Sequence, residues 1–166
     1  MLQVVLHEPE IPNNTGNIGR TCVATGCGLH LIRPLAFDTS EKACRRAGLD
    51  YWPRLQPREH ENFEAFLAAG VVPPRRLWFF TTKSARYAGA VEIAPGDGLV
   101  FGKETRGLPD SILQAYPEQL VTLPMMPGER SLNLATAVCA AVYLAMDGFV
   151  RRGEVVVDEQ GRIGRR

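Results

Sequence analysis

Short, continuously apolar runs alternate along the chain with longer segments of mixed polarity. Five of these runs predict buried strands, at residues 2–6, 29–32, 77–81, 99–101 and 120–123. Strands that lack a polar face and alternate with helices indicate the α/β class, because such strands are covered on both sides. We therefore expect a parallel sheet with helices on both faces.

Glycine, proline and capping residues mark the helices between these strands. The first helix is predicted to begin near Thr15, with Asn13 or Asn14 as its cap, and to stop at Gly26. Further helices are predicted over residues 40–47, 59–69, 109–115 and 131–146.

The last of these helices is apolar on nearly every side. Its apolar run, residues 134–146, is interrupted by Thr136 and Tyr143 and is shorter than the roughly 20 residues that cross a bilayer. We therefore expect no membrane span, but a helix buried on all sides in a protein core. Ser131 is placed to cap it by accepting a backbone N–H.

The length of the chain is typical of a single domain. Its 166 residues predict one domain over residues 1–150, followed by a polar tail over residues 151–166 that is partly disordered or a small edge strand. The start, MLQVVLHEPE, lacks the basic segment and small-residue cleavage site of a signal peptide. We therefore expect a cytoplasmic protein.

Neither the cysteines nor the histidines predict a metal site. Four cysteines are too few for a disulfide scaffold in a chain of this length, and no C-x-x-C pair is present. The three histidines are scattered and lack the spacing of zinc ligands. We expect reduced, mostly buried thiols and no bound metal.

Arginine dominates the positive charge, although the net charge is only +1. Guanidinium groups bind phosphate in a bidentate manner, so local groups of arginine are compatible with an RNA or DNA surface. They are also compatible with solvated faces in an arginine-rich protein. The candidates for phosphate contact are Arg45, Arg46, Arg75, Arg76, Lys83 and Arg86.

Three polar segments follow strand ends, where open α/β sheets bind ligands. They are residues 13–20 (NNTGNIGR), 101–109 (FGKETRGLP) and 123–133 (LPMMPGERSLN). None is a standard nucleotide loop. The G-x-G at residues 26–28 stands at a helix end, and Gly102 and Lys103 are followed by Glu104 rather than by Ser or Thr.

Taken together, the three segments resemble the signature motifs of the SPOUT class of RNA methyltransferases, and specifically the SpoU-type ribose 2'-O-methyltransferases. The likeness is greatest to the small, single-domain TrmL-like (YibK-like) subgroup, which methylates the wobble nucleotide of certain tRNAs. It covers residues 2–149 and rests on VVLHEPEIPNNTGNIGRTC, RRAGLDYW, FFTTKS, VFGKETRGLP and RSLNLATAV, in that order.

The resemblance implies a parallel sheet whose C-terminal part is threaded into a trefoil knot, which binds S-adenosylmethionine, and a homodimer. A knot could not be inferred from sequence pattern, since knots are nearly absent from proteins. It also implies that tRNA is bound through its anticodon stem-loop. The residues implied to line the cofactor site are Phe80, Gly102, Leu123 and Ser131.

The same resemblance implies a catalytic set of Arg20, Glu104 and Asn133. Guanidinium stays protonated, with a pKa above about 12, so we expect Arg20 to hold phosphate and stabilise alkoxide charge rather than act as a base. Whether Arg20 serves its own or a partner's site is left open. Glu104 either orients Arg20 or binds backbone amides, and Asn133 either fixes the loop or the ribose or caps the helix.

Two other functions stay open at this point. One is ribose methylation of ribosomal RNA, against which the lack of an added RNA-binding domain argues. The other is a non-catalytic RNA-binding or assembly protein with the same fold, against which the intact polar motif positions argue.

Overall fold

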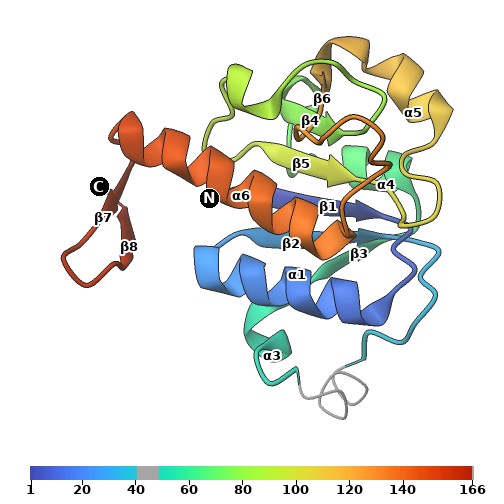
Figure 1. Cartoon of the computed structure of the whole chain (residues 1–166). Helices are drawn as coiled ribbons and strands as arrows, with labels where there is room; N and C mark the ends of the chain where they lie inside the picture. Colours follow the sequence, from blue (N-terminus) through green and yellow to red (C-terminus); the bar gives the residue numbers. More distant parts are fainter. Residues whose placement is uncertain (41–48, 166) are drawn as a thin grey trace.

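Six parallel strands form the centre of the computed structural model, which describes residues 1–40 and 49–165 (Figure 1). Their order across the sheet is β3-β2-β1-β5-β4-β6, and every neighbouring pair is parallel. The predicted α/β class is thereby confirmed. The strands are β1 (Gln3–His7), β2 (Gly28–Ile32), β3 (Arg58–His60), β4 (Leu77–Phe80), β5 (Gly98–Phe101) and β6 (Leu120–Val121).

Helices cover both faces of the sheet. In Figure 1, α1 (Pro12–Thr25) and α6 (Leu134–Arg151) lie side by side in front of the strands, and α3 (Trp52–Leu55) packs against α1. The opposite face is covered by α4 (Phe63–Ala68) and α5 (Asp110–Ala115). Single 3-10 turns occur at Pro74–Arg76, Ala88–Ala90 and Pro117–Gln119.

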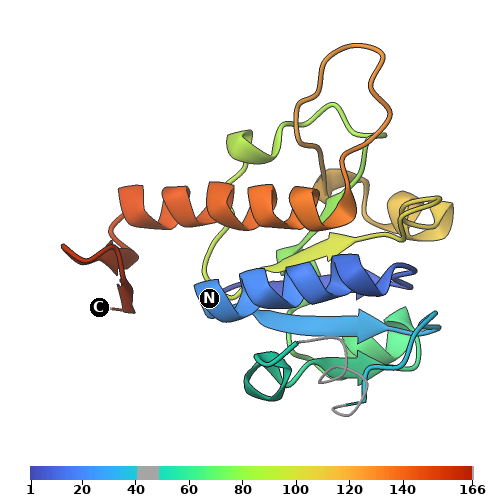
Figure 2. The same ribbon diagram turned by 60° about the horizontal axis from the view of Figure 1, so that its bottom comes forward.

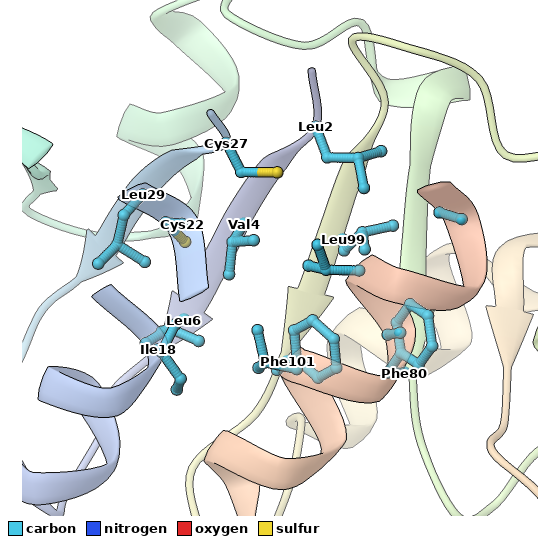
Figure 3. Close-up of a cluster of buried hydrophobic side chains, with 14 of the residues drawn as sticks. Leu2, Val4, Leu6, Ile18, Cys22, Cys27, Leu29, Phe80, Leu99 and Phe101 are labelled. Carbon is cyan, nitrogen blue, oxygen red and sulfur yellow. The ribbon is translucent and has the colours of Figure 1, made fainter. Parts of the chain in front are cut away.

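The two-residue period of the strands produces two separate cores. Leu2, Val4 and Leu6 point to the α1 side, where they meet Ile18 and Cys22 of α1 (Figure 3). Val5, which lies between them, belongs to the second core with α4 and α5. Since each central strand is buried on both faces, its sequence is continuously apolar.

One predicted helix is partly wrong. Residues 59–69 were expected to be helical, but residues 58–60 form the edge strand β3 and the helix starts only at Phe63. Asn62 sets that start, because its side chain accepts the N–H of Ala65 at 2.8 Å. The sequence of β3 is Arg-Glu-His, and these polar residues give an exposed edge strand no apolar signal. Of the helix predicted over residues 40–47, residues 41–47, with Cys44, Arg45 and Arg46, lie outside the described residues.

Both helices next to the polar segments begin elsewhere than predicted. Helix α1 starts at Pro12, and its N-cap residue, Ile11, makes no side-chain cap. Its predicted end is confirmed, with Gly26 in the left-handed conformation at φ 68°. Helix α6 is capped by Asn133 rather than Ser131, since Asn133 Oδ1 accepts the N–H groups of Ala135 and Thr136 at 2.9 and 3.3 Å.

Helix α6 is only partly buried within a single chain. Seven of its 18 residues lie in the core. By length and composition α6 could cross a membrane, but its buried face packs on the sheet, as in the core helix of a globular domain. The exposed side chains are Thr136, Ala140, Tyr143, Asp147 and Val150, which form one stripe along the helix, and Arg151 at its C-terminal end.

The polar tail forms a small antiparallel hairpin separate from the main sheet. Its strands are β7 (Val155–Val157) and β8 (Ile163–Arg165), and Val155 is its contact with the core. The hairpin lies at the C-terminal end of α6, at the left of Figure 1. The tail therefore forms strands, but as a separate hairpin rather than as the expected small edge strand.

A buried histidine pair joins the strands on one side of the sheet. His30 Nε2 lies 3.0 Å from Gln3 Oε1, and His30 Nδ1 lies 2.9 Å from His60 Nε2. Because the amide oxygen only accepts, His30 carries its proton on Nε2 and accepts from His60 Nε2–H at Nδ1. Burial, with the neighbouring His60 and Arg58, lowers the pKa of His30 to about 4, and burial lowers the pKa of His60 as well.

We predict that acidification destabilises the protein through His30. Its pKa is lower in the folded than in the unfolded chain, so the unfolded chain takes up the proton first as the pH falls below about 6.5. The free energy of unfolding should drop by about 3 kcal/mol between pH 7 and pH 4 from this group. Urea unfolding across this range, on the native chain and on His30→Leu, measures it. If the free energy of unfolding falls equally steeply with pH in both proteins, His30 is not the group responsible for the loss of stability.

Candidate active site

A cavity of about 550 Å³ opens at the carboxyl ends of β4, β5 and β6. Its walls come from the segments that follow these strands and from the starts of α1 and α6. Phe80, Gly102, Leu123 and Ser131, the four predicted cofactor residues, all line it, as do Glu104 and Asn133. Its volume is within the range of about 300–1,000 Å³ for small-molecule sites.

The cavity has one apolar side and one polar side. Phe80 and Phe101 stack with ring centroids 4.6 Å apart, and Leu123 and Leu134 continue this apolar wall. The loop between β6 and α6, residues 122–133, stands out from the body and forms another wall (Figure 2). Such a site suits a ligand with a flat apolar part and a polar or charged part.

Gly102 is required by the chain's own backbone. A Cβ atom there would lie 2.0 Å from the carbonyl carbon of Gly107 and 2.1 Å from the nitrogen of Leu108. The turn is closed by the Gly107 N–H, which donates to the Lys103 carbonyl at 2.8 Å, and Gly107 has a φ of 70°. We expected a ligand to use the space left by the missing side chain of Gly102. Backbone atoms of Gly107 and Leu108 occupy that space instead.

Glu104 binds backbone amides, which was one of its two predicted roles. Its carboxylate accepts the N–H of Glu10 at 2.8 Å, the N–H of Ile11 at 3.2 Å and Asn14 Nδ2–H at 2.9 Å. None of these atoms belongs to Arg20, so within the described residues Glu104 does not orient that side chain. Glu104 instead supplies the acceptor for N–H groups at the start of α1, which has no cap of its own.

Asn14 connects all three polar segments. Its side chain donates to Glu104, and its Oδ1 accepts Asn133 Nδ2–H at 3.0 Å. Only 7% of Asn14 is exposed, whereas sequence reasoning gave it the role of a helix cap. Its partners are 90 and 119 residues away, and no local pattern indicates such a pairing.

Two further contacts fasten the loop after β1 to the loop after β5. Glu10 accepts the backbone N–H and the hydroxyl of Thr105, both at 3.0 Å, and Lys103 Nζ lies 2.7 Å from Glu8 Oε2. His7 is buried beside this loop, which lowers its pKa, and its Nδ1 has no hydrogen-bond partner among the described residues. The wall formed by Glu104 is therefore held at several points.

Arg20 lies outside the cavity. It is exposed on α1, with its guanidinium carbon 4.7 Å from the centroid of the Tyr51 ring. Over residues 1–40 and 49–165 no ion pair to a carboxylate involves Arg20. Tyr143, considered as a residue that could reach the site or bond to a loop, is 53% exposed on α6 and does not line the cavity.

Most of the described phosphate-binding candidates are already paired with carboxylates. Lys83 lies 2.6 Å from Asp110, Arg86 lies 3.3 Å from Glu118, and Arg76 lies 2.6 Å from the buried Asp97. Two arginines that were not among the candidates, Arg106 and Arg130, are exposed at the cavity wall. They form no ion pair in the described part of the chain.

The described residues contain no group of three or more His, Cys, Asp or Glu side chains that could hold a metal ion. Cys22 and Cys27 are buried and free, and burial raises the pKa of both thiols. Cys139 is half-buried on α6 and also free.

Comparison with protein families matches residues 1–143 to the model of the SpoU rRNA Methylase family. A protein of Escherichia coli K12 named tRNA (cytidine(34)-2'-O)-methyltransferase is 48% identical over 159 residues, covering 95% of this chain and 100% of that protein. A protein of Aeromonas hydrophila with the same name is 51% identical over 144 residues, covering 86% of this chain and 91% of its own length.

Two solved structures of methyltransferases are also similar to this chain. One described as addressing 2-OH methylation of C/U34 on tRNA has a TM-score of 0.83 and 44% identity, and covers 92% of this chain and 98% of that chain. A SpoU methyltransferase of Streptomyces viridochromogenes in complex with AdoMet has a TM-score of 0.71 and 25% identity, and covers 91% of this chain and 61% of that chain.

Proposed function

Because the chain belongs to the SpoU rRNA methylase family, we propose that it transfers a methyl group from S-adenosylmethionine to the ribose 2'-hydroxyl of the wobble nucleotide of tRNA, a cytidine or a modified uridine. One observation carries this proposal. The E. coli relative named for that reaction at cytidine 34 aligns over its entire length at 48% identity.

The cavity suits S-adenosylmethionine by size and chemistry. Phe80, Phe101 and Leu123 offer an apolar wall for a flat adenine, and the loops carrying Gly102 and Ser131 offer backbone polar groups for the ribose and the amino-acid part. When bound, the cofactor supplies a methyl group already activated by its sulfonium charge. No protein nucleophile and no metal are then needed, and the protein's contribution is positioning and electrostatics.

We propose that Arg20 stabilises the negative charge that develops on the ribose 2'-oxygen while its proton passes to solvent water. Among the described residues Arg20 has no carboxylate partner, so its five N–H donors are available for phosphate and ribose oxygens. Glu104 and Asn133 act as positioning residues, since their side-chain atoms are occupied by the amides and by Asn14. They hold the cavity walls against which the reacting groups align.

The anticodon stem-loop would contact the rim of the cavity. Arg106 and Arg130 are proposed to bind its phosphates because they are exposed, unpaired among the described residues and next to the cofactor site. Lys83 and Arg86 would have to break ion pairs first. Arg106 and Arg130 are added to the earlier candidates, of which Arg45 and Arg46 lie outside the described residues and Arg75 stays a candidate.

The trefoil knot is proposed for the segment from β4 to α6. Its support is the family likeness, together with the path of residues 122–133, which run from the edge strand β6 back to α6 beside α1. The loop over residues 102–108 lines the same cavity, so the two proposed knot loops would enclose the cofactor.

We further propose a cytoplasmic homodimer that forms through α1 and α6. The exposed stripe of α6 combines Ala140, Tyr143 and Val150, and the adjacent exposed face of α1 carries Arg20. A stripe of this kind on a small domain indicates an interface, and twofold pairing is the commonest solution. Light scattering should give about twice the chain mass of 18.3 kDa, and Tyr143→Glu should shift it toward the monomer. A monomeric native chain would refute this packing.

The activity is tested with purified protein, S-adenosylmethionine and unmodified tRNA transcripts, followed by mass spectrometry of the nucleosides and of anticodon fragments. We expect one added methyl group on the wobble ribose, and its absence in tRNA from cells that lack the protein. A ribosomal RNA substrate in parallel tests the alternative specificity. Methylation of that RNA alone would overturn the tRNA proposal, and RNA binding without any transfer would favour the non-catalytic function.

Arg20→Ala separates a catalytic from a structural role for the first polar segment. We expect methyl transfer to fall about a hundredfold or more, as for the loss of one preorganised electrostatic group. Calorimetric affinity for the cofactor and the melting temperature should stay unchanged, because Arg20 does not line the cavity. Arg20→Lys should recover little, since an ammonium group lacks the guanidinium fork. If the alanine variant keeps most of its methyl-transfer activity, the proposed catalytic role of Arg20 is wrong.

A further inference from the structure

Two glycines allow α3 to approach α1 closely at the position of Arg20. A Cβ atom on Gly19 would lie 2.9 Å from Leu55 Cδ2 and 3.3 Å from Tyr51 Cε2, and a Cβ atom on Gly16 would lie 3.2 Å from Leu49 Cδ2. These positions are one turn apart on the same side of α1. The missing side chains leave room for the ring of Tyr51 against the helix.

Tyr51 packs in this space together with Leu49, Trp52 and Leu55. Only 2% of the residue is exposed, and its hydroxyl donates a hydrogen bond to the carbonyl oxygen of Gly16. The ring is therefore fixed from two sides, by packing against Gly19 and by its hydroxyl. The guanidinium carbon of the exposed Arg20 lies 4.7 Å above the ring centroid, within the distance of a cation–π contact.

We propose that Tyr51 is the positioning residue for Arg20. Stacking on the ring occupies one face of the guanidinium plane, whereas its N–H donors point outward along the edges and stay available to RNA oxygens. Over the described ranges no carboxylate is paired with Arg20, so the aromatic ring is the contact that restricts the direction of the side chain. The inference rests on the proposed role of Arg20 in methyl transfer.

This arrangement gives a reason for an arginine carried on a glycine-rich helix face. An exposed arginine loses much rotamer freedom when it binds, and a ring already beneath it removes part of that loss before RNA arrives. The restriction of Arg20 by Tyr51 should therefore raise the rate of methyl transfer. It should not change cofactor binding, because Tyr51 does not line the cofactor cavity.

The experiment compares Tyr51→Phe with Tyr51→Leu in single-turnover methyl transfer to tRNA. The phenylalanine ring still stacks, so we expect a rate within about threefold of the native one; leucine removes the ring, and the rate should fall about tenfold, the size expected for losing a cation–π contact. Cofactor affinity should be native in both. Trp52→Phe is the matched control, because Trp52 also packs on Gly19, whereas within the described residues the cation–π contact of Arg20 is with Tyr51. It should lower the melting temperature and keep the rate.

A double-mutant cycle with Arg20→Ala decides whether Tyr51 acts through Arg20. In that background Tyr51→Leu should cause no further loss of rate. Additive losses would show a general structural role and overturn the inference, as would a native rate in Tyr51→Leu. If Arg20→Ala itself keeps native activity, the catalytic proposal fails and the inference fails with it. If Arg20→Ala transfers the methyl group slowly but Tyr51→Leu has the native rate, the inference about Tyr51 is wrong and the catalytic proposal for Arg20 stands.

Discussion

The carboxylate of Glu104 is the contact on which the site depends. Helix α1 begins without a side-chain cap, and the N–H groups of Glu10 and Ile11 lie just before its first turn. Glu104 reaches them from the loop after β5, the strand that lies next to β1. One acidic residue thus satisfies the helix start and fixes the spacing between two loops that form the cavity wall. Asn14 extends the connection to Asn133 and hence to the start of α6.

Ion pairing divides the positive charge of the molecule into two groups. Several exposed cations are neutralised locally by acidic neighbours, so their presence in the sequence overstates the free positive charge. The unpaired arginines named above lie at the cavity rim and on the exposed face of α1. A chain with a net charge of only +1 can therefore present a local field suited to a polyanion.

The apolar elements of the fold could be predicted from the sequence, because strand burial depends mainly on local composition. All five predicted strands are present, whereas β3 was missed because its polar residues are typical of an exposed edge. The lining of the cavity was implied by family likeness. The bonds from Glu104 to Glu10 and from Asn14 to Asn133 could not be found, since each joins residues far apart in the chain. The ion pairs of Lys83 and Arg86 escaped prediction for the same reason.

The position of α6 has a consequence for folding during synthesis. The core on the α1 side is built from Leu2, Val4, Leu6 and Ile18, which leave the ribosome early, and from Val138 and Val142 of α6, which leave it late. Until α6 is released, the apolar side of β1 and α1 has no cover from that helix. Such contacts of long sequence separation form slowly, and the uncovered surface is open to aggregation in the meantime. The nascent chain is thus most in need of a chaperone just before its last helix emerges.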